Sequence, residues 1–218
     1  HNVLLVDTDA QDQCASHLGL KQFQPGLADL ILGETTPRQA LIKARDRCFL
    51  LPAGDRMAEV KSRLPEIGAR LGLPPEQILS KALSFTESGK LAFVIYDTAP
   101  GHDSMLVNVL GHAHVIAVPI PPEMQAIRGM KRFFRRVRDL GRDVDFILPT
   151  IHDRRVGKTF RIMVKLEERF PDRLLGKISY SSLISEAAGA GMTIFEFKPG
   201  HVTAMEYVAA AKALAGVN

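Results

Sequence analysis

Residues 92–101 read AFVIYDTAPG, and this stretch decides the fold class. Its apolar side chains and one tyrosine form a nearly continuous run, as is typical of a parallel strand covered on both faces. The run ends in a carboxylate, Asp97, and the chain then turns through Pro100 and Gly101. Similar short runs lie at residues 3–7, 48–52, 114–119, 144–149 and 174–178. The pattern therefore predicts six strands, most of them parallel.

Helical patterns separate these runs along the chain. They lie at residues 56–71, 75–88, 103–111, 123–140, 157–170 and 201–215. Alternation of strands and helices predicts an α/β fold, with a doubly wound, mostly parallel sheet flanked by helices. Because no internal repeat, low-complexity tract or linker interrupts the alternation, we expect a single domain over residues 1–218.

Composition excludes several classes of protein. The chain has 218 residues, of which 46% are hydrophobic and 24% charged, as in ordinary globular proteins. No apolar run approaches the roughly 18–20 residues of a membrane span, so we expect no membrane partner. The two cysteines, Cys14 and Cys48, have no metal-ligand spacing and are too few for a disulfide framework. A reducing cytoplasm is the expected location.

Positive charge is concentrated in one part of the chain. The net charge is only +4, yet residues 128–177 hold 15 Lys and Arg against 7 Asp and Glu. Residues 128–138, RGMKRFFRRVR, predict an amphipathic helix whose phenylalanines face the core. The cations of interest are Arg132, Arg135 and Arg136 on this helix, and Arg154 and Arg155 in a second cluster. They form either a solvated surface or a site for a polyanion such as DNA, which needs only phosphate contacts.

Carboxylates at strand ends are the candidate chemical groups, because ligands of such sheets bind beyond the carboxyl ends of the strands. Asp97 could hold Mg²⁺ through water, or it could cap the next helix. Asp7 and Asp9 leave another strand one residue apart and would share one side of an extended chain. Such crowding requires a cation or a network of donors. A carboxylate near a γ-phosphate could orient the attacking water, whereas a pair of helix caps is the alternative.

Several blocks of the sequence resemble the ParA/Soj/MinD family of partition ATPases. VLLVDTDAQDQCASHLGL, from Val3, is similar to the family's strand ending DxDPQGNAS. AFVIYDTAPG, with Leu106 and Asn108 downstream, resembles its second switch, DTAPG…L…N. The resemblance continues through HVIAVPIPPEMQAIRGM, FILPTIHDRRV and SEAAGAGMTIFEF to HVTAMEYVAAAKAL near the C-terminus. It therefore covers nearly the whole chain.

This resemblance implies an ATPase that uses ATP and Mg²⁺ in plasmid or chromosome partition or in positioning other cargo. It also implies a homodimer formed on ATP, non-specific DNA binding, a ParB-like activator and a cytoplasmic, nucleoid-associated location. The implied roles are water orientation for Asp9, support of the first switch for Asp7, water-mediated Mg²⁺ binding for Asp97, and proximity to adenine for Thr150 and Asp153. Three departures are Asp12 for the family's glycine, Ala10 for its proline, and KISYSS from Lys177, which lacks the usual proline.

The family's phosphate-binding loop has no counterpart in these blocks. Family members carry a strand, a KGGxGKT-type loop and a helix before the segment at Val3. The GKT at residues 157–159 does not replace that loop, because His152 stands where another glycine is required. We expect roughly 30–40 further residues upstream, which is the scale of a βαβ unit. They would supply a central strand of the sheet. Without that strand, the edges of its neighbouring strands would be left unpaired. The chain alone is expected not to hydrolyse ATP; the alternative is an inactive remnant serving as a dimerisation or DNA-binding module.

Overall fold

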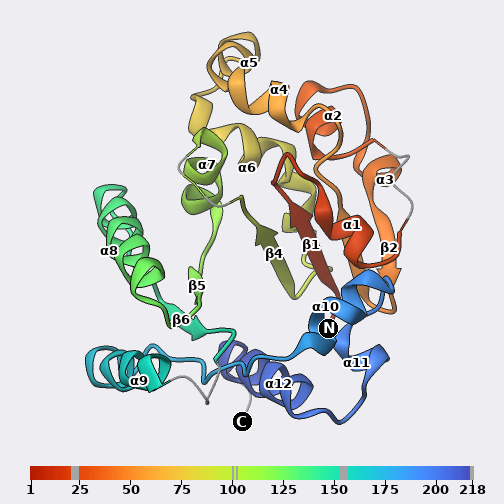
Figure 1. The fold of residues 1–218 in the computed structure, drawn as a ribbon. Coiled ribbons are helices and arrows are strands. Elements are labelled where there is room, and N and C mark those ends of the chain that lie inside the picture. Colours follow the sequence, from red (N-terminus) through yellow and green to blue (C-terminus); the bar gives the residue numbers. More distant parts are fainter. Residues whose placement is uncertain (21–24, 100, 102, 153–156, 217–218) are drawn as a thin grey trace. The chain divides into compact units, whose positions relative to one another are not determined.

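The chain forms two compact units, His1–Ala113 and His114–Asn218. The structure, a computed structural model, describes residues 1–20, 25–99, 101, 103–152 and 157–216. Each unit is an α/β arrangement of mostly parallel strands and helices, which confirms the predicted fold class (Figure 1). The expectation of a single domain remains a prediction.

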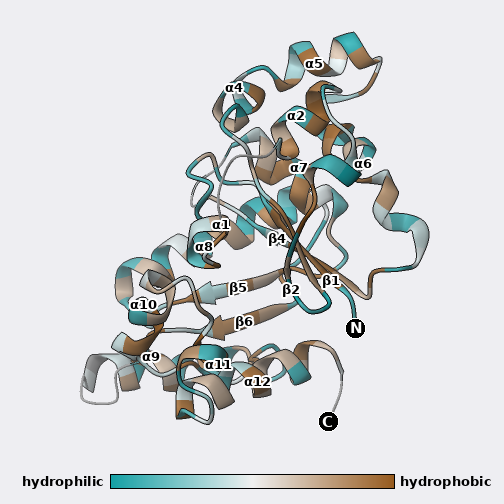
Figure 2. Cartoon of the chain, turned by 90° about the vertical axis from the view of Figure 1, so that its right-hand side faces the viewer, coloured by the Kyte–Doolittle hydropathy of each residue, from teal (hydrophilic) through white to brown (hydrophobic). Residues whose placement is uncertain are grey.

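The first unit is built on a sheet with the strand order β2-β3-β1-β4. Strands β1 (Val3–Asp7), β3 (Cys48–Leu51) and β4 (Phe93–Asp97) are parallel, and β2 (Ile42–Arg45) is antiparallel at one edge. Apolar residues dominate β1 and β4, as Figure 2 shows. The register pairs Asp7 with Asp97, so the two strands deliver their carboxylates to the same edge.

Helices cover this sheet unequally. The helical segments are α1 (Gln13–His17), α2 (Leu27–Leu32), α3 (Pro37–Ala40), α4 (Met57–Ser62), α5 (Leu64–Leu71), η1 (Pro75–Gln77), α6 (Ile78–Ala82), η2 (Ser84–Ser88) and α7 (Ser104–His112). The larger core joins Leu4 and Val6 of β1 to buried residues of α2 and α4 to α7. A smaller cluster packs Cys14 and Ala15 of α1 against Leu50.

Two of the predicted helices are interrupted. Residues 56–71 form α4 and α5, which meet at Arg63. Pro65 lies in the first turn of α5, where its missing N–H costs nothing but prevents a continuous helix through this point. Residues 75–88 likewise divide into η1, α6 and η2.

Strand β4 ends the first sheet in the described part of the chain, and it is unusually exposed for an apolar strand. Its only strand partner there is β1, while Phe93 and Ile95 are 38% and 50% exposed. An apolar edge with unpaired backbone groups is a template for a further strand.

The second unit contains a pair of parallel strands, β5 (Ala117–Ile120) and β6 (Phe146–Pro149). Its helices are α8 (Met124–Asp139), α9 (Gly157–Arg169), α10 (Ser182–Gly189), α11 (Ile194–Phe197) and α12 (Val202–Leu214). The prediction of a strand at residues 174–178 is wrong, because only isolated bridges link Leu174 to Ile147 and Ser179 to His152. Gly176 lies between them at φ 87°, and this left-handed residue interrupts the extended chain.

Candidate nucleotide and metal site

Asp7 ends β1 as a fully buried carboxylate. Its Oδ1 accepts a hydrogen bond from the Asp9 N–H at 2.9 Å, and its Oδ2 accepts one from the Cys14 N–H at 3.1 Å. Burial raises the pKa of Asp7, although these two donors act in the opposite direction. Backbone donors thus provide the compensating network expected for this charge, and Asp7 fixes the loop that leads from β1 into α1.

Asp97 ends β4 as an exposed carboxylate. Its carbonyl oxygen accepts hydrogen bonds from the Thr8 N–H at 2.9 Å and from the Thr8 hydroxyl at 2.7 Å. Its Oδ2 accepts one from the Cys14 thiol at 3.1 Å. The side chain therefore does not cap α7, since Asp103 is the residue whose carboxylate accepts the Leu106 N–H there.

Asp7, Cys14 and Asp97 each place one possible ligand atom within 4.8 Å of the other two. Burial, followed by the nearby aspartates, raises the pKa of the Cys14 thiol, and this thiol donates a hydrogen bond to Asp97 Oδ2. Mg²⁺ is a hard cation that prefers carboxylate oxygens and water, whereas sulfur ligands suit softer metals. The donor set therefore fits Mg²⁺ on the carboxylates.

Asp9 lies half-buried in the turn that follows β1. Its Oδ1 accepts a hydrogen bond from the Gln11 N–H at 3.0 Å, and its carbonyl accepts one from the Asp12 N–H. The turn presents the Asp9 carboxylate separately from that of Asp7, which is buried. Its role with water remains a prediction.

Asp12, which stands where the family pattern has glycine, adopts the left-handed conformation that glycine favours, with φ 47°. Aspartate tolerates this conformation better than most residues. Its carboxylate accepts hydrogen bonds from the N–H groups of Ala53 at 3.1 Å and Gly54 at 3.3 Å. Asp12 therefore joins the loop after β1 to the loop after β3, a role that its spacing alone did not indicate.

Lys61 is a second residue that the motifs did not reveal. Its ammonium group contacts Asp103 Oδ2 at 2.7 Å, and its carbonyl accepts a hydrogen bond from the Ser104 hydroxyl. Burial opposes ionisation of Asp103, but Lys61 and the Leu106 N–H outweigh it and lower the pKa of this carboxyl group. The N-cap residue of α7, Asp103, lies six residues beyond Asp97 and is thereby fixed to α4.

The predicted adenine contacts belong to the second unit. Thr150 follows β6 half-buried, and its N–H donates to the Ile120 carbonyl at 2.9 Å. Beside it, Ser179 donates through both N–H and hydroxyl to the Glu206 carboxylate, each at 2.7 Å. Asp153 lies outside the described residues, as do Arg154 and Arg155.

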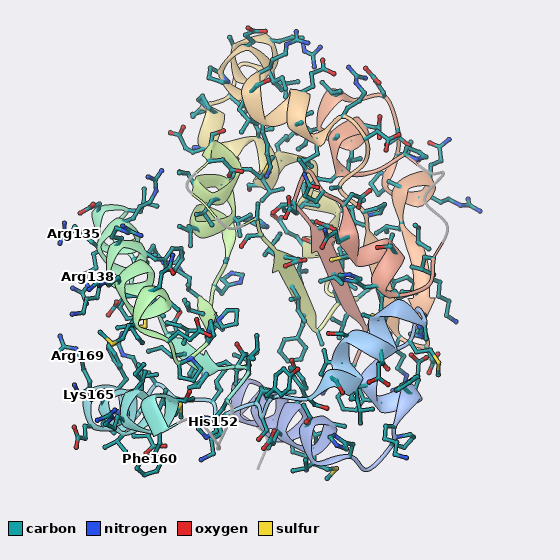
Figure 3. All side chains as sticks on the ribbon, in the orientation of Figure 1. Arg135, Arg138, His152, Phe160, Lys165 and Arg169 are labelled. Atoms are coloured by element: carbon teal, nitrogen blue, oxygen red, sulfur yellow. The ribbon has the colours of Figure 1, made fainter. Side chains whose placement is uncertain are left out.

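Helix α8 is amphipathic, as predicted. Phe134 is buried and meets Phe170 edge-on at 5.7 Å, while Phe133 is half-buried. Arg132 and Arg135 are exposed, but Arg136 is half-buried. Figure 3 labels the cations Arg135, Arg138, Lys165 and Arg169 on α8 and α9.

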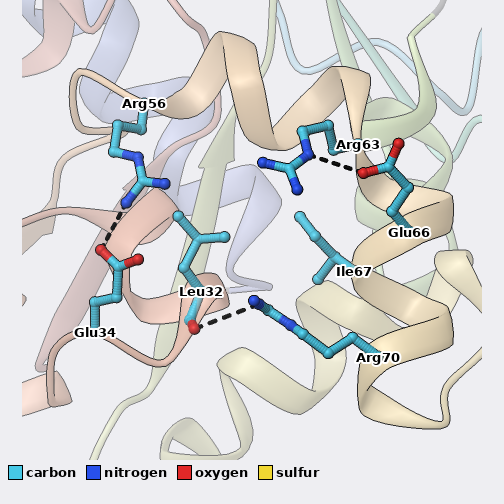
Figure 4. Close-up of a pocket in the computed structure, with 7 residues that line it drawn as sticks. All are labelled: Leu32, Glu34, Arg56, Arg63, Glu66, Ile67 and Arg70. Atoms are coloured by element: carbon cyan, nitrogen blue, oxygen red, sulfur yellow. Dashed lines mark hydrogen bonds and ion pairs between the residues drawn. The ribbon is translucent and has the colours of Figure 1, made fainter.

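A small hollow in the first unit contains charges that largely compensate one another (Figure 4). It is lined by Leu32, Glu34, Arg56, Arg63, Glu66, Ile67 and Arg70. Arg56 contacts Glu34 at 2.6 Å and Arg63 contacts Glu66 at 2.9 Å. It contains none of the residues that the motifs single out.

A family model described as "AAA domain" (AAA_31) matches residues 1–148, well over half of the chain. The chain belongs to this family. Among curated relatives, the chromosome partitioning protein ParA of Caulobacter vibrioides is 23% identical over 203 residues, which cover 88% of this chain and 74% of that protein. The resemblance to the ParA/Soj/MinD ATPases is thereby confirmed.

Solved structures of family proteins share the fold. An ATP complex of a Cyanothece McdA variant has a TM-score of 0.80 and 18% identity, covering all of this chain and 86% of the McdA chain. The septum site-determining protein MinD of Pyrococcus horikoshii, complexed with Mg-ADP, has a TM-score of 0.75 and 17% identity, covering 98% and 83% of the two chains. At these identities the likeness shows the fold.

Proposed function

We propose that this family member is a Mg²⁺-dependent ATPase that partitions DNA or positions another cargo. The observation that carries the proposal is the pairing of Asp7 with Asp97 at one sheet edge, with the connecting loops held by short hydrogen bonds. The relatives' names, which include chromosome partitioning and cell division proteins, support this class of activity.

The proposed roles follow from where each carboxylate lies. Asp97 is exposed and would hold Mg²⁺ through water, with Asp7 as the buried support of the neighbouring loop. Bound Mg²⁺ supplies charge neutralisation at the phosphates. Asp9, in the turn beyond β1, would orient the attacking water.

An upstream phosphate loop would complete this site. The exposed apolar edge of β4 supports pairing with a further parallel strand, which would bring such a loop to the same end of the sheet as Asp97. ATP hydrolysis is accordingly proposed for the natural protein, on the condition that such a loop completes its site.

The proposed partners are a second copy bound on ATP, DNA held without sequence preference, and a ParB-like activator. Exposed Arg132 and Arg135 support the DNA proposal, because a cationic helix surface can neutralise phosphates. Thr150 and Asp153 remain the proposed adenine contacts. No helix among the described residues is long and apolar enough to span a membrane.

Phosphate release and nucleotide binding by the purified natural protein test the proposal, with ATP, with ATP plus EDTA, and with ATP plus DNA and the activator. We expect hydrolysis that requires Mg²⁺ and rises with DNA and a cognate activator. Absence of both nucleotide binding and hydrolysis would refute the ATPase and favour a dimerisation or DNA-binding module.

A further inference from the structure

Beyond its pairing with Asp7 in the sheet, Asp97 accepts hydrogen bonds from one segment of the chain, residues 8–14. Thr8 donates twice to the Asp97 carbonyl oxygen, at 2.9 Å from its N–H and 2.7 Å from its hydroxyl. Cys14 donates to Asp97 Oδ2 at 3.1 Å from its thiol. The backbone and the side chain of Asp97 are therefore restrained from the same direction.

The donors are themselves fixed in place. Thr8 is 1% exposed, and Cys14 is buried at the start of α1. The Cys14 N–H donates to the buried Asp7 carboxylate, which fixes the backbone from which the thiol reaches Asp97. A chain of contacts thus runs from Asp7 through Cys14 to Asp97.

The two carboxylate oxygens of Asp97 differ in their hydrogen bonding. Cys14 occupies Oδ2, whereas no described residue donates a hydrogen bond to Oδ1. An exposed carboxylate otherwise rotates between orientations, and binding a cation would have to arrest that rotation. A fixed carboxylate with one oxygen open suits a hydrated cation, which requires a well-placed acceptor.

We propose that Thr8 and Cys14 are positioning residues that hold Asp97 in one orientation for a hydrated divalent cation. The inference rests on the proposed nucleotide site and adds two residues to it. Cys14 acts here as a hydrogen-bond donor and not as a metal ligand. Its thiol can be replaced by another donor, but not by a methyl group.

An infrared measurement tests the contact in the absence of ligand. Cys48 is replaced by serine so that Cys14 carries the only thiol of the chain. We expect the S–H stretching band at a lowered, hydrogen-bonded frequency, and a shift upwards in the Asp97→Ala variant. A band at the same frequency with and without Asp97 would overturn the inference.

A titration tests the function of the contact in the natural protein. The Mg²⁺ concentration that half-maximally raises the melting temperature is measured at fixed ATP. We expect Cys14→Ala and Thr8→Val each to raise it about three- to ten-fold, the range for one lost hydrogen bond. Cys14→Ser and Thr8→Ser, which keep a donor, should restore it. An unchanged Mg²⁺ requirement in both Cys14→Ala and Thr8→Val would contradict the proposal.

The two measurements separate this inference from the proposed function. If the natural protein shows no Mg²⁺-dependent stabilisation with ATP, the proposed function fails. The infrared band then decides alone whether the Cys14 thiol holds Asp97. If stabilisation is present and the variants do not alter it, the proposed function stands and the positioning role fails.

Discussion

The end of β1 and β4 and the surface of α8 illustrate two ways of arranging charge. At the strand ends, Asp7 and Asp12 have backbone donors within 3.3 Å, and Asp7 is fully buried. On α8, Arg132 and Arg135 project from an exposed surface. At the strand ends, the function of each side chain depends on its exact position. On α8, DNA binding should depend on the total positive charge of the surface. Substitutions should therefore have large, individual effects at the strand ends and smaller, additive ones on α8.

Replacing Asp97 with alanine should give the largest effect. The change removes the proposed metal-binding carboxylate and should lower the ATP hydrolysis rate of the natural protein by about 100-fold or more, the scale for losing an electrostatic stabiliser in a phosphate site. Steady-state phosphate release measures this rate. Glu87→Ala, which removes an exposed carboxylate from η2, is the control and should leave the rate unchanged.

Replacing Asp12 with alanine should be the next largest change. It leaves the Ala53 and Gly54 N–H groups without an acceptor and places a less tolerant residue at φ 47°, so unfolding should become easier by about 2 kcal/mol. Urea denaturation measures the difference. Asp12→Gly also removes the acceptor, but glycine adopts this left-handed conformation without strain. Its free energy of unfolding should therefore fall by only about half as much as that of Asp12→Ala. Equal stability of all three proteins would show that this loop contact contributes nothing.

The α8 surface should respond more weakly and with a dependence on salt. The double variant Arg132→Ala/Arg135→Ala should bind DNA roughly ten-fold less tightly and reduce the slope of log affinity against log salt by about 2. Fluorescence anisotropy over a salt series measures both. Arg38→Ala/Lys81→Ala removes the same charge from exposed positions of the first unit and is the matched control. An equal loss of DNA affinity in the control would show that the net charge of the protein, and not the α8 surface, governs DNA binding.

The smallest effect should come from the ion pair between Lys61 and Asp103, in which a largely buried cation contacts a partly exposed carboxylate. Asp103→Asn keeps a helix cap but loses the charge that Lys61 contacts, and the 38% exposure of the Asp103 side chain reduces the loss through solvent screening. We expect a loss of about 0.5 kcal/mol at neutral pH.

The pH dependence of that loss has a definite sign. Because the folded protein lowers the pKa of Asp103, the carboxylate contributes stability above its usual pKa of 3.8. That contribution is lost as the pH falls through the lowered pKa of the native state. Urea denaturation of the parent protein and the Asp103→Asn variant at neutral and acidic pH should show their free energies of unfolding converging in acid. A difference that stays constant with pH would show that the ion pair does not cause it.

The sequence was sufficient where a signal is local. The strand at residues 3–7 and the helices near 103–111, 123–140 and 157–170 follow from runs and periodicity that need no partner. The short segments α1, α2 and α3 and the antiparallel β2 were missed, because four to six residues are too few to show a period. The prediction of a strand at 174–178 was wrong because Gly176 adopts a left-handed backbone conformation, which a pattern of hydrophobic residues does not reveal.

The candidate site divides in the same way. Strand-end position identified Asp7, Asp9 and Asp97 from sequence. The contact between Cys14 and Asp97 joins residues 83 positions apart, and no local pattern indicates it. Lys61 contacts Asp103, 42 positions away in the sequence, and no local pattern indicates this contact either. Only folding brings these partners together.

The two edges of the first sheet have a practical consequence for handling the protein. The edge formed by β2 carries Lys43 and Arg45, and charges there discourage pairing with another chain. The opposite edge presents Phe93 and Ile95 without such protection. Any fragment that leaves β4 outermost should self-associate through that edge and aggregate as its concentration rises. A lysine at Ile95 would then restore solubility without touching the residues proposed to bind nucleotide.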